Sequence, residues 1–249
     1  MISVVINTYN AEKYLAEVLE SVKDFDEMVV CDMDSTDRTV DIARQYGCRV
    51  VHFPKGDINI AEPARDFAIH QATHPWVLVV DADEVVSRAL RDYLYDITSR
   101  PDCPDGLYLP RRNYFMGRFM HAVYPDYILR FFRKEGAYWP PTVHSKPEVK
   151  GRTEHAPKHL HLALKHLSND TISGRLLKTD VYTDNEVDRK LSHHFGPWDF
   201  ISRPTHRFFK SYILKGGFRD GLPGFIYACL DATYQVVMMG KVLERQKKE

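Results

Sequence analysis

Short apolar runs alternate with segments of helical periodicity along the first hundred residues of the chain. The runs are rich in β-branched residues and apolar throughout, which is typical of strands buried on both faces of a sheet. Between them, apolar residues such as Leu15, Val18, Leu19 and Val22 recur at helical spacing. Strands are predicted over residues 2–6, 28–31, 49–53 and 76–80, and helices over 11–22, 36–46 and 61–72. This alternation favours an α/β fold with a mostly parallel sheet, helices on both faces and ligands at the carboxyl ends of the strands.

Beyond residue 86 the pattern changes twice. First come a helix opened by a serine and two more strands, which are predicted over residues 87–98, 107–109 and 127–132. From about residue 171 the pattern is helical, with three prolines as predicted breaks, Pro197, Pro204 and Pro223. We therefore expect an α/β domain over residues 1–168 and a helical extension over 169–249.

The apolar tract over residues 222–239 raises the question of a membrane span. It contains Pro223, Gly224, Asp231 and Gln235, which a spanning segment tolerates poorly. We interpret it as a core or interfacial helix.

Charge is balanced, with 34 Lys and Arg residues against 34 Asp and Glu residues. Without a global positive field the chain is not expected to bind nucleic acid, so partners must be inferred from local features. The four cysteines, Cys31, Cys48, Cys103 and Cys229, form no C-x-x-C pair, which favours reduced core residues in a cytosolic protein. The chain starts with a predicted strand and shows no export signal, so we expect a cytoplasmic location.

An acidic triplet, Asp81, Ala82 and Asp83, follows directly after the apolar run 76–80. In an extended segment, side chains two residues apart share a face, so the two carboxylates repel each other unless a cation lies between them. A hard divalent ion such as Mg²⁺ or Mn²⁺ binds one or two carboxylates and completes its shell with water and phosphate oxygens. The triplet therefore predicts a metal that holds a diphosphate, with a solvated acidic turn as the plainer alternative.

Polar residues near other strand ends favour the interpretation of the triplet as a site for a metal and a diphosphate over that of a solvated turn. Asp32 follows the predicted strand 28–31, and its acceptor-only carboxylate suits the N–H of a nucleotide base. Arg65, in the third predicted helix, carries a guanidinium that can bind a phosphate through two N–H groups. The turn after the first strand and the helix it opens supply free amides and further candidates, which are Thr8, Tyr9, Asn10 and Glu12. Helix capping and surface charge remain alternatives for Asp32, Glu12 and Arg65.

The order and spacing of three groups of residues carry a family resemblance. They are VVINTYNAE at 4–12, VVCD at 29–32 with STDRT at 35–39, and LVVDADE at 78–84. These motifs resemble glycosyltransferase family 2. The later stretches are similar to the branch that includes bacterial lipopolysaccharide-core glucosyltransferases, and they read PRRNYFMG at 110–117, YPD at 124–126, RFFR at 130–133, GFRDG at 217–221 and GF at 224–225.

The resemblance implies a GT-A fold over residues 1–168, a nucleoside-diphosphate sugar donor that is usually a UDP-sugar, a divalent metal, and inversion at the anomeric carbon. It also implies roles for the candidate residues: Asp32 contacts the base, Thr8 and Glu12 the nucleoside, Arg65 the diphosphate or base, Asp81 the ribose or metal, and Asp83 the metal. Asp34 departs from the pattern, since the family commonly has a small residue and then Gly-Ser after its first acid. We expect Asp34 to alter the base pocket or the choice of donor.

A third metal ligand stays open between two histidines. The family often has Val-His-Glu where this chain has Val143, His144 and Ser145, so only the histidine is kept. His166 resembles another recurring family histidine and is the rival for the same role. The histidines show no zinc-site spacing, which argues against a zinc enzyme.

Inversion by direct displacement requires a base that removes the proton of the acceptor hydroxyl. Asp126 is the candidate, because Pro125 holds the preceding chain extended and a strand follows; a turn acid at a strand start is the alternative. Three arginines are expected to offset leaving-group charge or bind an anionic acceptor, unless they are exposed strand-end charges: Arg111, Arg112 and Arg130.

We expect the enzyme to transfer the sugar to a carbohydrate or lipid-linked acceptor of a bacterial cell-surface glycan. A peripheral contact with the cytoplasmic membrane is expected from mixed aromatic, aliphatic and basic residues, which are Phe208, Phe209, Tyr212, Ile213 and Leu214 with Arg207, Lys210, Lys215 and Arg219. The alternatives are a sugar-nucleotide nucleotidyltransferase, whose glycine-rich loop is missing after the first strand, and a catalytically silent nucleotide-binding protein. A dehydrogenase is disfavoured because no strand-to-helix turn carries G-x-G-x-x-G.

Overall fold

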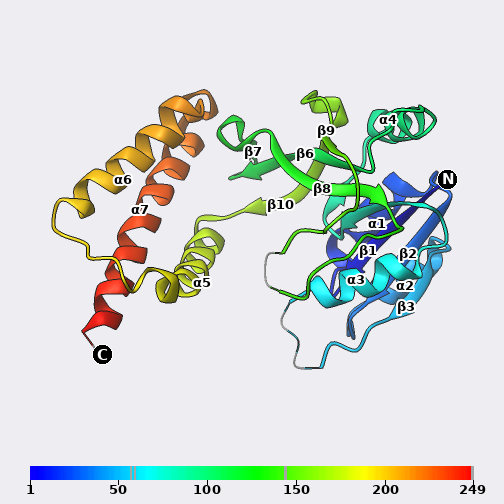
Figure 1. Cartoon of the computed structure of the whole chain (residues 1–249), viewed down its shortest axis with the longest axis horizontal. Coiled ribbons are helices and arrows are strands. Elements are labelled where there is room, and N and C mark those ends of the chain that lie inside the picture. Colours follow the sequence, from blue (N-terminus) through cyan, green and yellow to red (C-terminus); the bar gives the residue numbers. More distant parts are fainter. Residues whose placement is uncertain (57, 59, 143–144, 248–249) are drawn as a thin grey trace. The chain divides into compact units, whose positions relative to one another are not determined.

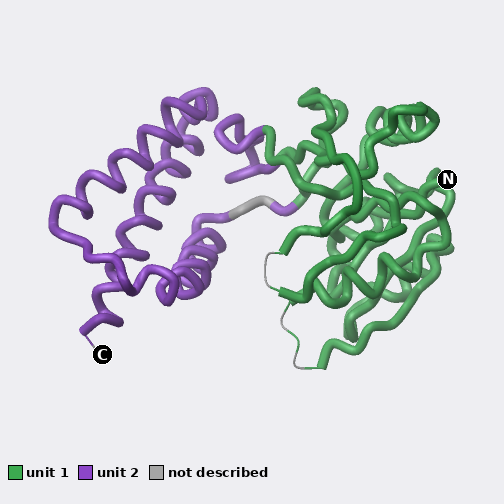
Figure 2. Tube along the Cα trace, viewed as in Figure 1, with its two compact units in different colours: residues 1–112, 125–167 green, residues 113–124, 168–249 purple. Residues whose placement is uncertain are grey.

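The computed structural model describes residues 1–56, 58, 60–142 and 145–247, with side chains described throughout these ranges except at 169 and 170. The chain divides into two compact units, coloured green and purple in Figure 2. Unit 1 comprises Met1–Arg112 and Pro125–Leu167, and unit 2 comprises Asn113–Tyr124 and Ser168–Glu249. The second unit therefore includes the helical C-terminal part and also a short segment from earlier in the chain, Asn113–Tyr124, which we call the excursion.

A mixed sheet forms the centre of unit 1, with the strand order β3-β2-β1-β4-β8-β6-β10-β5 (Figure 1). Its parallel part consists of β1 (Ile2–Thr8), β2 (Glu27–Asp32), β3 (Arg49–His52) and β4 (Trp76–Asp81). The other strands on this path are β5 (Glu84–Val85), β6 (Gly106–Phe115), β8 (Asp126–Arg133) and β10 (Leu164–Asp170). The pairings of β4 with β8, β8 with β6 and β10 with β5 are antiparallel, and β7 (Arg118–Phe119) and β9 (Thr153–His155) pair with β6.

Helices cover both faces of the parallel part, as the unbroken apolar strands predict. On one face lie α1 (Glu12–Val22), α2 (Thr39–Gln45) and α4 (Arg88–Thr98), packed on alternate residues of β1 such as Val4 and Ile6. On the other face lies α3 (Glu62–Gln71), packed in the cluster that contains Val5. Both clusters are fully buried along β1, so this strand is the centre of the core.

The predicted strands and helices of this half form, with one shifted boundary. Helix α4 starts after Ser87, whose Oγ accepts the Leu90 N–H at 3.0 Å, as expected of a capping serine. Helix α2 starts at Thr39, three residues later than predicted, because the preceding residues bind another loop. Ser35 Oγ accepts the Asn10 N–H at 2.9 Å, and Asn10 Oδ1 accepts the Thr36 N–H at 2.8 Å.

Unit 2 is mainly helical. Its elements are η1 (His121–Val123), α5 (Ile172–Lys190), α6 (Asp199–Phe209), the π-turn η3 (Lys210–Leu214), η4 (Gly217–Asp220) and α7 (Gly221–Gln246), while η2 (Leu160–Leu162) belongs to unit 1. Packing of α5 and α7 buries Val187, Met238, Met239 and Val242. Across the described residues, no helix is both long and apolar enough to cross a membrane.

The predicted break at Pro204 is wrong, because α6 continues through this residue. A proline removes one backbone donor, and the packing of α6 along α7 maintains the helix around it. Pro197 precedes α6, and Pro223 lies in the first turn of α7, where its missing N–H costs no helical hydrogen bond.

Glu27 fastens the start of β2 to its neighbours. Its carboxylate accepts hydrogen bonds from the Ser3 hydroxyl, from the Thr73 N–H at 2.8 Å and from Arg49 Nη2 at 3.0 Å. Burial by itself raises the pKa of Glu27, but these hydrogen bonds lower it to about 2. The charged form of Glu27 is therefore part of what stabilises the sheet.

We expect Glu27→Gln to reduce the free energy of unfolding at pH 7 by about 3 kcal/mol, the value of a pKa difference between 4.5 and about 2. Because the pKa is depressed in the folded state, this contribution is present above about pH 4.5 and is lost as the pH falls toward 2. Urea unfolding of the wild type and the variant at pH 7, 4 and 3 measures the difference between their free energies of unfolding. This gap should narrow as the pH falls. The exposed Glu20→Gln is the control, with an effect below about 0.5 kcal/mol. A gap of equal size at pH 3 and pH 7 would show that the charge is not its source.

Candidate active site

The parallel strands bring three predicted site residues to one edge of the sheet. Thr8 is in register with Asp32, and Asn7 is in register with Asp81. Thr8 Oγ1 donates to Asp32 Oδ1 at 3.1 Å, and the other Asp32 oxygen accepts the Ser35 N–H at 3.0 Å. Thr8 and Asp32 are both buried, so the Asp32 carboxylate is held in a fixed orientation at the strand end.

Two predicted donor-binding residues, Asn10 and Glu12, join the β1–α1 loop to the loop before α2. Asn10 has a left-handed backbone with φ 48°, a conformation that asparagine adopts more readily than most residues. Glu12 Oε2 accepts the Arg38 N–H at 3.0 Å, and its own N–H donates to Asp37 Oδ2 at 3.1 Å. In this structure the side chains of Asn10 and Glu12 thus connect two loops.

Asp34 and Tyr9 lie at the outer side of the same edge. Asp34 Oδ1 is 2.6 Å from His52 Nε2, and Oδ2 accepts the Lys55 N–H at 2.8 Å. The hydrogen bond with His52 lowers the pKa of Asp34 from its ordinary value. Tyr9 is half-exposed, and Lys55 Nζ lies 5.0 Å from the centre of its ring. Asp34, which departs from the family pattern, therefore holds the segment after β3.

Asp81 is bound by two arginines. Arg65 Nη2 donates to Asp81 Oδ1 at 2.6 Å, and Arg130 Nη2 donates to Asp81 Oδ2. Burial by itself raises the pKa of the Asp81 carboxyl, but the charges of Arg130 and Arg65 hold it well below its ordinary value. Asp81 is therefore an anion across the physiological pH range.

Both guanidinium groups have further nitrogen atoms that are buried. Arg65 Nε and Arg130 Nε and Nη1 are buried and have no hydrogen-bond partner among the described residues. The Trp139 ring lies 4.9 Å from Arg65 Cζ and 5.8 Å from Arg130 Cζ, and its buried Nε1 also has no partner in the described part of the chain. A buried donor without an acceptor costs free energy, so this group of donors suits an anionic ligand such as a diphosphate.

A buried glutamate links the acidic triplet to the predicted catalytic base. Glu84 has no exposed surface; Oε2 accepts the Asp81 N–H at 3.0 Å and Oε1 accepts Arg111 Nη1 at 3.1 Å. Arg111 also donates to Asp126 Oδ2 from Nη2 at 2.7 Å and from Nε at 3.0 Å. Burial by itself lowers the pKa of Arg111, but Glu84 and Asp126 raise it above its ordinary value. The structure thus places Asp126 at the outer end of an ionic chain that starts at Glu84.

Asp83 and His166 form the pair of predicted metal ligands that the structure brings together. The antiparallel pairing of β10 with β5 sets His166 opposite Glu84, and His166 Nε2 lies 3.1 Å from Asp83 Oδ2. His144 lies outside the described residues. Among the residues that are described, no group of three or more His, Cys, Asp or Glu side chains is arranged to hold a metal ion. The pair can therefore supply two ligands, and both Asp81 oxygens are taken by arginines.

Residues 3–134 match the family model for glycosyl transferase family 2. This is more than half of the chain, and the chain belongs to this family.

Relatives and solved structures agree with this classification. The chain is 27% identical to the lipopolysaccharide core biosynthesis glycosyltransferase LpsC of Rhizobium meliloti (strain 1021), over 98% of this chain and 92% of the relative. It is also 27% identical to an uncharacterized glycosyltransferase of Rickettsia felis, over 98% of this chain and 89% of the relative. Its fold is similar to that of the mannosyltransferase PcManGT from Pyrobaculum calidifontis, with a TM-score of 0.58 and 15% identity over 97% of this chain and 86% of that chain. These findings confirm the predicted family and the GT-A fold.

Sequence reasoning missed two residues of the site. Glu84 was visible only as the acid after the triplet, and an acid that follows a strand end is ordinarily exposed. Trp139 gave no signal, since it reaches Arg65 and Arg130 from a distant Pro-rich segment.

We expect Glu84→Ala to destabilise the protein by about 3 kcal/mol, because it leaves the Asp81 N–H and part of Arg111 buried without their acceptor. The neighbouring Asp83→Ala is the matched control and should cost less than about 1 kcal/mol, since Asp83 is partly exposed. Chemical denaturation of both variants measures the difference. Similar small losses in both would mean that Glu84 is not the buried anchor of this network.

Proposed function

We propose that the chain is an inverting glycosyltransferase that moves a sugar from a nucleoside diphosphate, with UDP the expected nucleotide, to a saccharide or lipid-linked acceptor of a bacterial cell-surface glycan such as the lipopolysaccharide core. One observation carries the proposal. The buried guanidinium N–H groups of Arg65 and Arg130 lie beside Asp81 at the carboxyl edge of the parallel strands, without acceptors among the described residues. Ligands of open α/β sheets bind at such an edge, and phosphate oxygens are the acceptors that arginine pairs with best.

The other residues at this edge fit the remaining parts of the donor. Asp32, oriented by Thr8 and Ser35, suits the N–H of a base, and Tyr9, the residue after Thr8, offers a half-exposed ring. The similarity to LpsC favours a cell-surface glycan as the acceptor. PcManGT, whose fold is similar, is described in complex with GDP-Man and Mn²⁺, which favours a nucleoside-diphosphate sugar with a metal.

Asp83 and His166 are the residues that would hold a divalent cation. A carboxylate suits Mg²⁺ or Mn²⁺, whereas an imidazole suits transition metals, so this donor pair favours Mn²⁺. The ion, when bound, would supply positive charge to the diphosphate leaving group. Asp81, held by two arginines, would orient their remaining N–H groups toward the same diphosphate rather than bind the metal itself.

Asp126 is proposed to accept the proton of the acceptor hydroxyl. Asp126 is the first residue of β8. Two nitrogens of Arg111 bind its Oδ2, which fixes the direction of the carboxylate. A fixed carboxylate keeps its orientation toward an incoming hydroxyl at no further cost in entropy. Arg111 is in this view a positioning residue, and Glu84 positions Arg111.

Measurements of UDP affinity in two variants test the proposal, because each variant is expected to change the affinity, and its dependence on Mn²⁺, in a different way. UDP should bind about tenfold more tightly with Mn²⁺, and Asp83→Ala should abolish this increment while it leaves metal-free binding unchanged. Arg65→Ala should weaken UDP binding about 10- to 100-fold with or without the metal, because hydrogen bonds to a charged ligand are lost. Calorimetric titration of UDP, GDP and dTDP measures both effects and identifies the base.

Arg133→Ala is the matched control for Arg65, because Arg133 is a half-exposed arginine paired with Asp105 at the other end of β8. It should leave UDP affinity unchanged, and the thermal midpoint of each variant shows that it is folded. Equal UDP affinity in the wild type and in folded Arg65→Ala would reject the diphosphate site.

Asp126→Asn should bind the donor normally but slow sugar transfer about 10²-fold or more, as the loss of a general base does. The amide oxygen can still accept from Arg111, so the fold is expected to persist. Transfer of radiolabelled sugar from UDP-glucose to delipidated surface oligosaccharide measures the rate, with the exposed Asp24→Asn as the control. Near-normal transfer by Asp126→Asn would remove Asp126 from the mechanism.

A further inference from the structure

The turn between α6 and α7 exposes an unusual set of large apolar side chains. Residues 209–222, called the hairpin tip, contain the π-turn η3, the short helix η4 and the start of α7. Five of its apolar side chains have between 47% and 78% of their surface exposed, and they are Phe209, Ile213, Leu214, Phe218 and Leu222. Figure 1 shows these elements at one end of the α6–α7 hairpin. Exposure of five large apolar side chains within one short segment is typical of a surface that binds a partner.

The exposed charges of the hairpin tip are all positive. Lys210, Lys215 and Arg219 are interleaved with the apolar residues and exposed. The one acid of the segment, Asp220, has no exposed surface. The tip therefore combines apolar side chains with cations alone.

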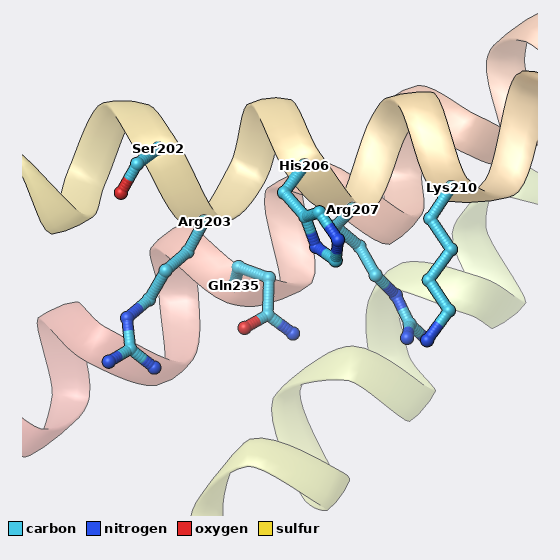
Figure 3. A pocket seen from close by; sticks show the side chains of 6 residues that line it. All are labelled: Ser202, Arg203, His206, Arg207, Lys210 and Gln235. Carbon is cyan, nitrogen blue, oxygen red and sulfur yellow. The ribbon is translucent and has the colours of Figure 1, made fainter.

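The cationic character continues along α6. Ser202, Arg203, His206, Arg207, Lys210 and Gln235 line a pocket of about 380 Å³ between α6 and α7, and Figure 3 shows the four basic side chains on the α6 side of it. Arg203 is paired with Asp199, and Arg207 is 3.5 Å from Asp231. Lys210, at the end of this pocket, is also the first residue of η3.

The tip is held in shape by a buried carboxylate and by close backbone contacts. Asp220 accepts the N–H groups of His121 at 2.9 Å and Ala122 at 3.0 Å, and it lies 2.6 Å from His121 Nδ1. A Cβ on Gly224 would be 2.0 Å from the Gly217 carbonyl oxygen, so only glycine permits this approach of the two turns. The exposed apolar residues are thus presented by an ordered framework.

The sequence-based membrane surface is corrected by this framework at two positions. Phe208 and Tyr212 are only partly exposed, and both pack on Phe225 with ring centres 5.6 and 5.7 Å apart. Phe209, Ile213 and Leu214 of the predicted surface are exposed, and Phe218 and Leu222, which the sequence pattern had not distinguished, are exposed beside them in the chain.

We propose that the hairpin tip docks on a bilayer that contains anionic phospholipids. The five apolar side chains enter the interfacial layer, and Lys210, Lys215 and Arg219 contact headgroup phosphates. Apolar residues that alternate with lysine and arginine, without an exposed acid, match the apolar interior and the negative surface of such a bilayer. This proposal rests on unit 2 alone and does not depend on the proposed function.

Cosedimentation with sucrose-loaded vesicles tests the proposal. The full chain should bind vesicles of phosphatidylcholine with 30% phosphatidylglycerol about tenfold more tightly than vesicles of phosphatidylcholine alone, because each cation adds attraction to an anionic surface. Leu214→Ser with Leu222→Ser should lower the partition coefficient on the anionic vesicles at least tenfold. Lys210→Gln with Lys215→Gln should remove the preference for anionic lipid.

Leu177→Ser with Val181→Ser is the matched control, since these aliphatic residues of α5 are similarly exposed but lie outside the tip. It should bind as the wild type does. Far-UV circular dichroism and the thermal midpoint show that each variant is folded, which is expected because all four substituted aliphatic residues are exposed.

Three results would overturn the proposal. The first is wild-type protein that binds neither type of vesicle, and the second is a control variant that loses as much binding as the tip variant. The third is a wild-type dimer in sedimentation equilibrium that Leu214→Ser with Leu222→Ser converts to a monomer without any change in vesicle binding, since the occupant of the tip would then be a second copy of the chain.

Discussion

The ionic network around Asp81 and Glu84 is the constraint on which unit 1 depends. Two carboxylates at the end of β4 and in β5 meet three arginines, from α3, β6 and β8. These elements come from both the parallel and the antiparallel parts of the sheet, so the network joins the two. Buried charges stabilise a protein only when they are fully paired, which means that the network tolerates the loss of any single member poorly. It also leaves Arg65 Nε and Arg130 Nε and Nη1 buried without a hydrogen-bond partner among the described residues.

Side-chain hydrogen bonds hold the loops at the edge beside this network. Thr8 and Ser35 orient Asp32, while Asn10, Glu12 and Asp37 join the two loops that follow β1 and β2. Most of these bonds use side chains that accept backbone N–H groups, so the loops are fixed without regular secondary structure. A site whose loops are already ordered loses less conformational entropy when it binds a nucleotide, and more of the contact energy remains as affinity. The left-handed Asn10 is the local conformation that this arrangement requires.

The sequence predicted best those features whose signals lie within a short stretch of the chain. The four parallel strands and the helices α1, α3 and α4 follow from runs and spacings within about a dozen residues, and they formed close to their predicted bounds. The convergence of Thr8, Asp32 and Asp81 followed from the rule that parallel strands align their carboxyl ends. Spacing gave no such signal for contacts across long separations, such as Arg130 with Asp81 over 49 residues and His166 with Asp83 over 83, and only the family resemblance had pointed to His166 and Asp83 as ligands of one metal. The burial of Glu84 depends on these same contacts, which is why the acid was read only as part of a motif.

The Arg111–Asp126 ion pair lies next to the points where the chain leaves unit 1 and returns to it. These residues are opposite each other in the β6–β8 register, and the chain leaves unit 1 after Arg112 and returns at Pro125. The excursion between them, Asn113–Tyr124, belongs to unit 2, where Asp220 binds His121 and Ala122. The ion pair therefore joins β6 and β8 next to the two points where this segment of unit 2 begins and ends. Because Glu84 binds Arg111 from the buried side, the direction of the proposed base depends on the core of unit 1.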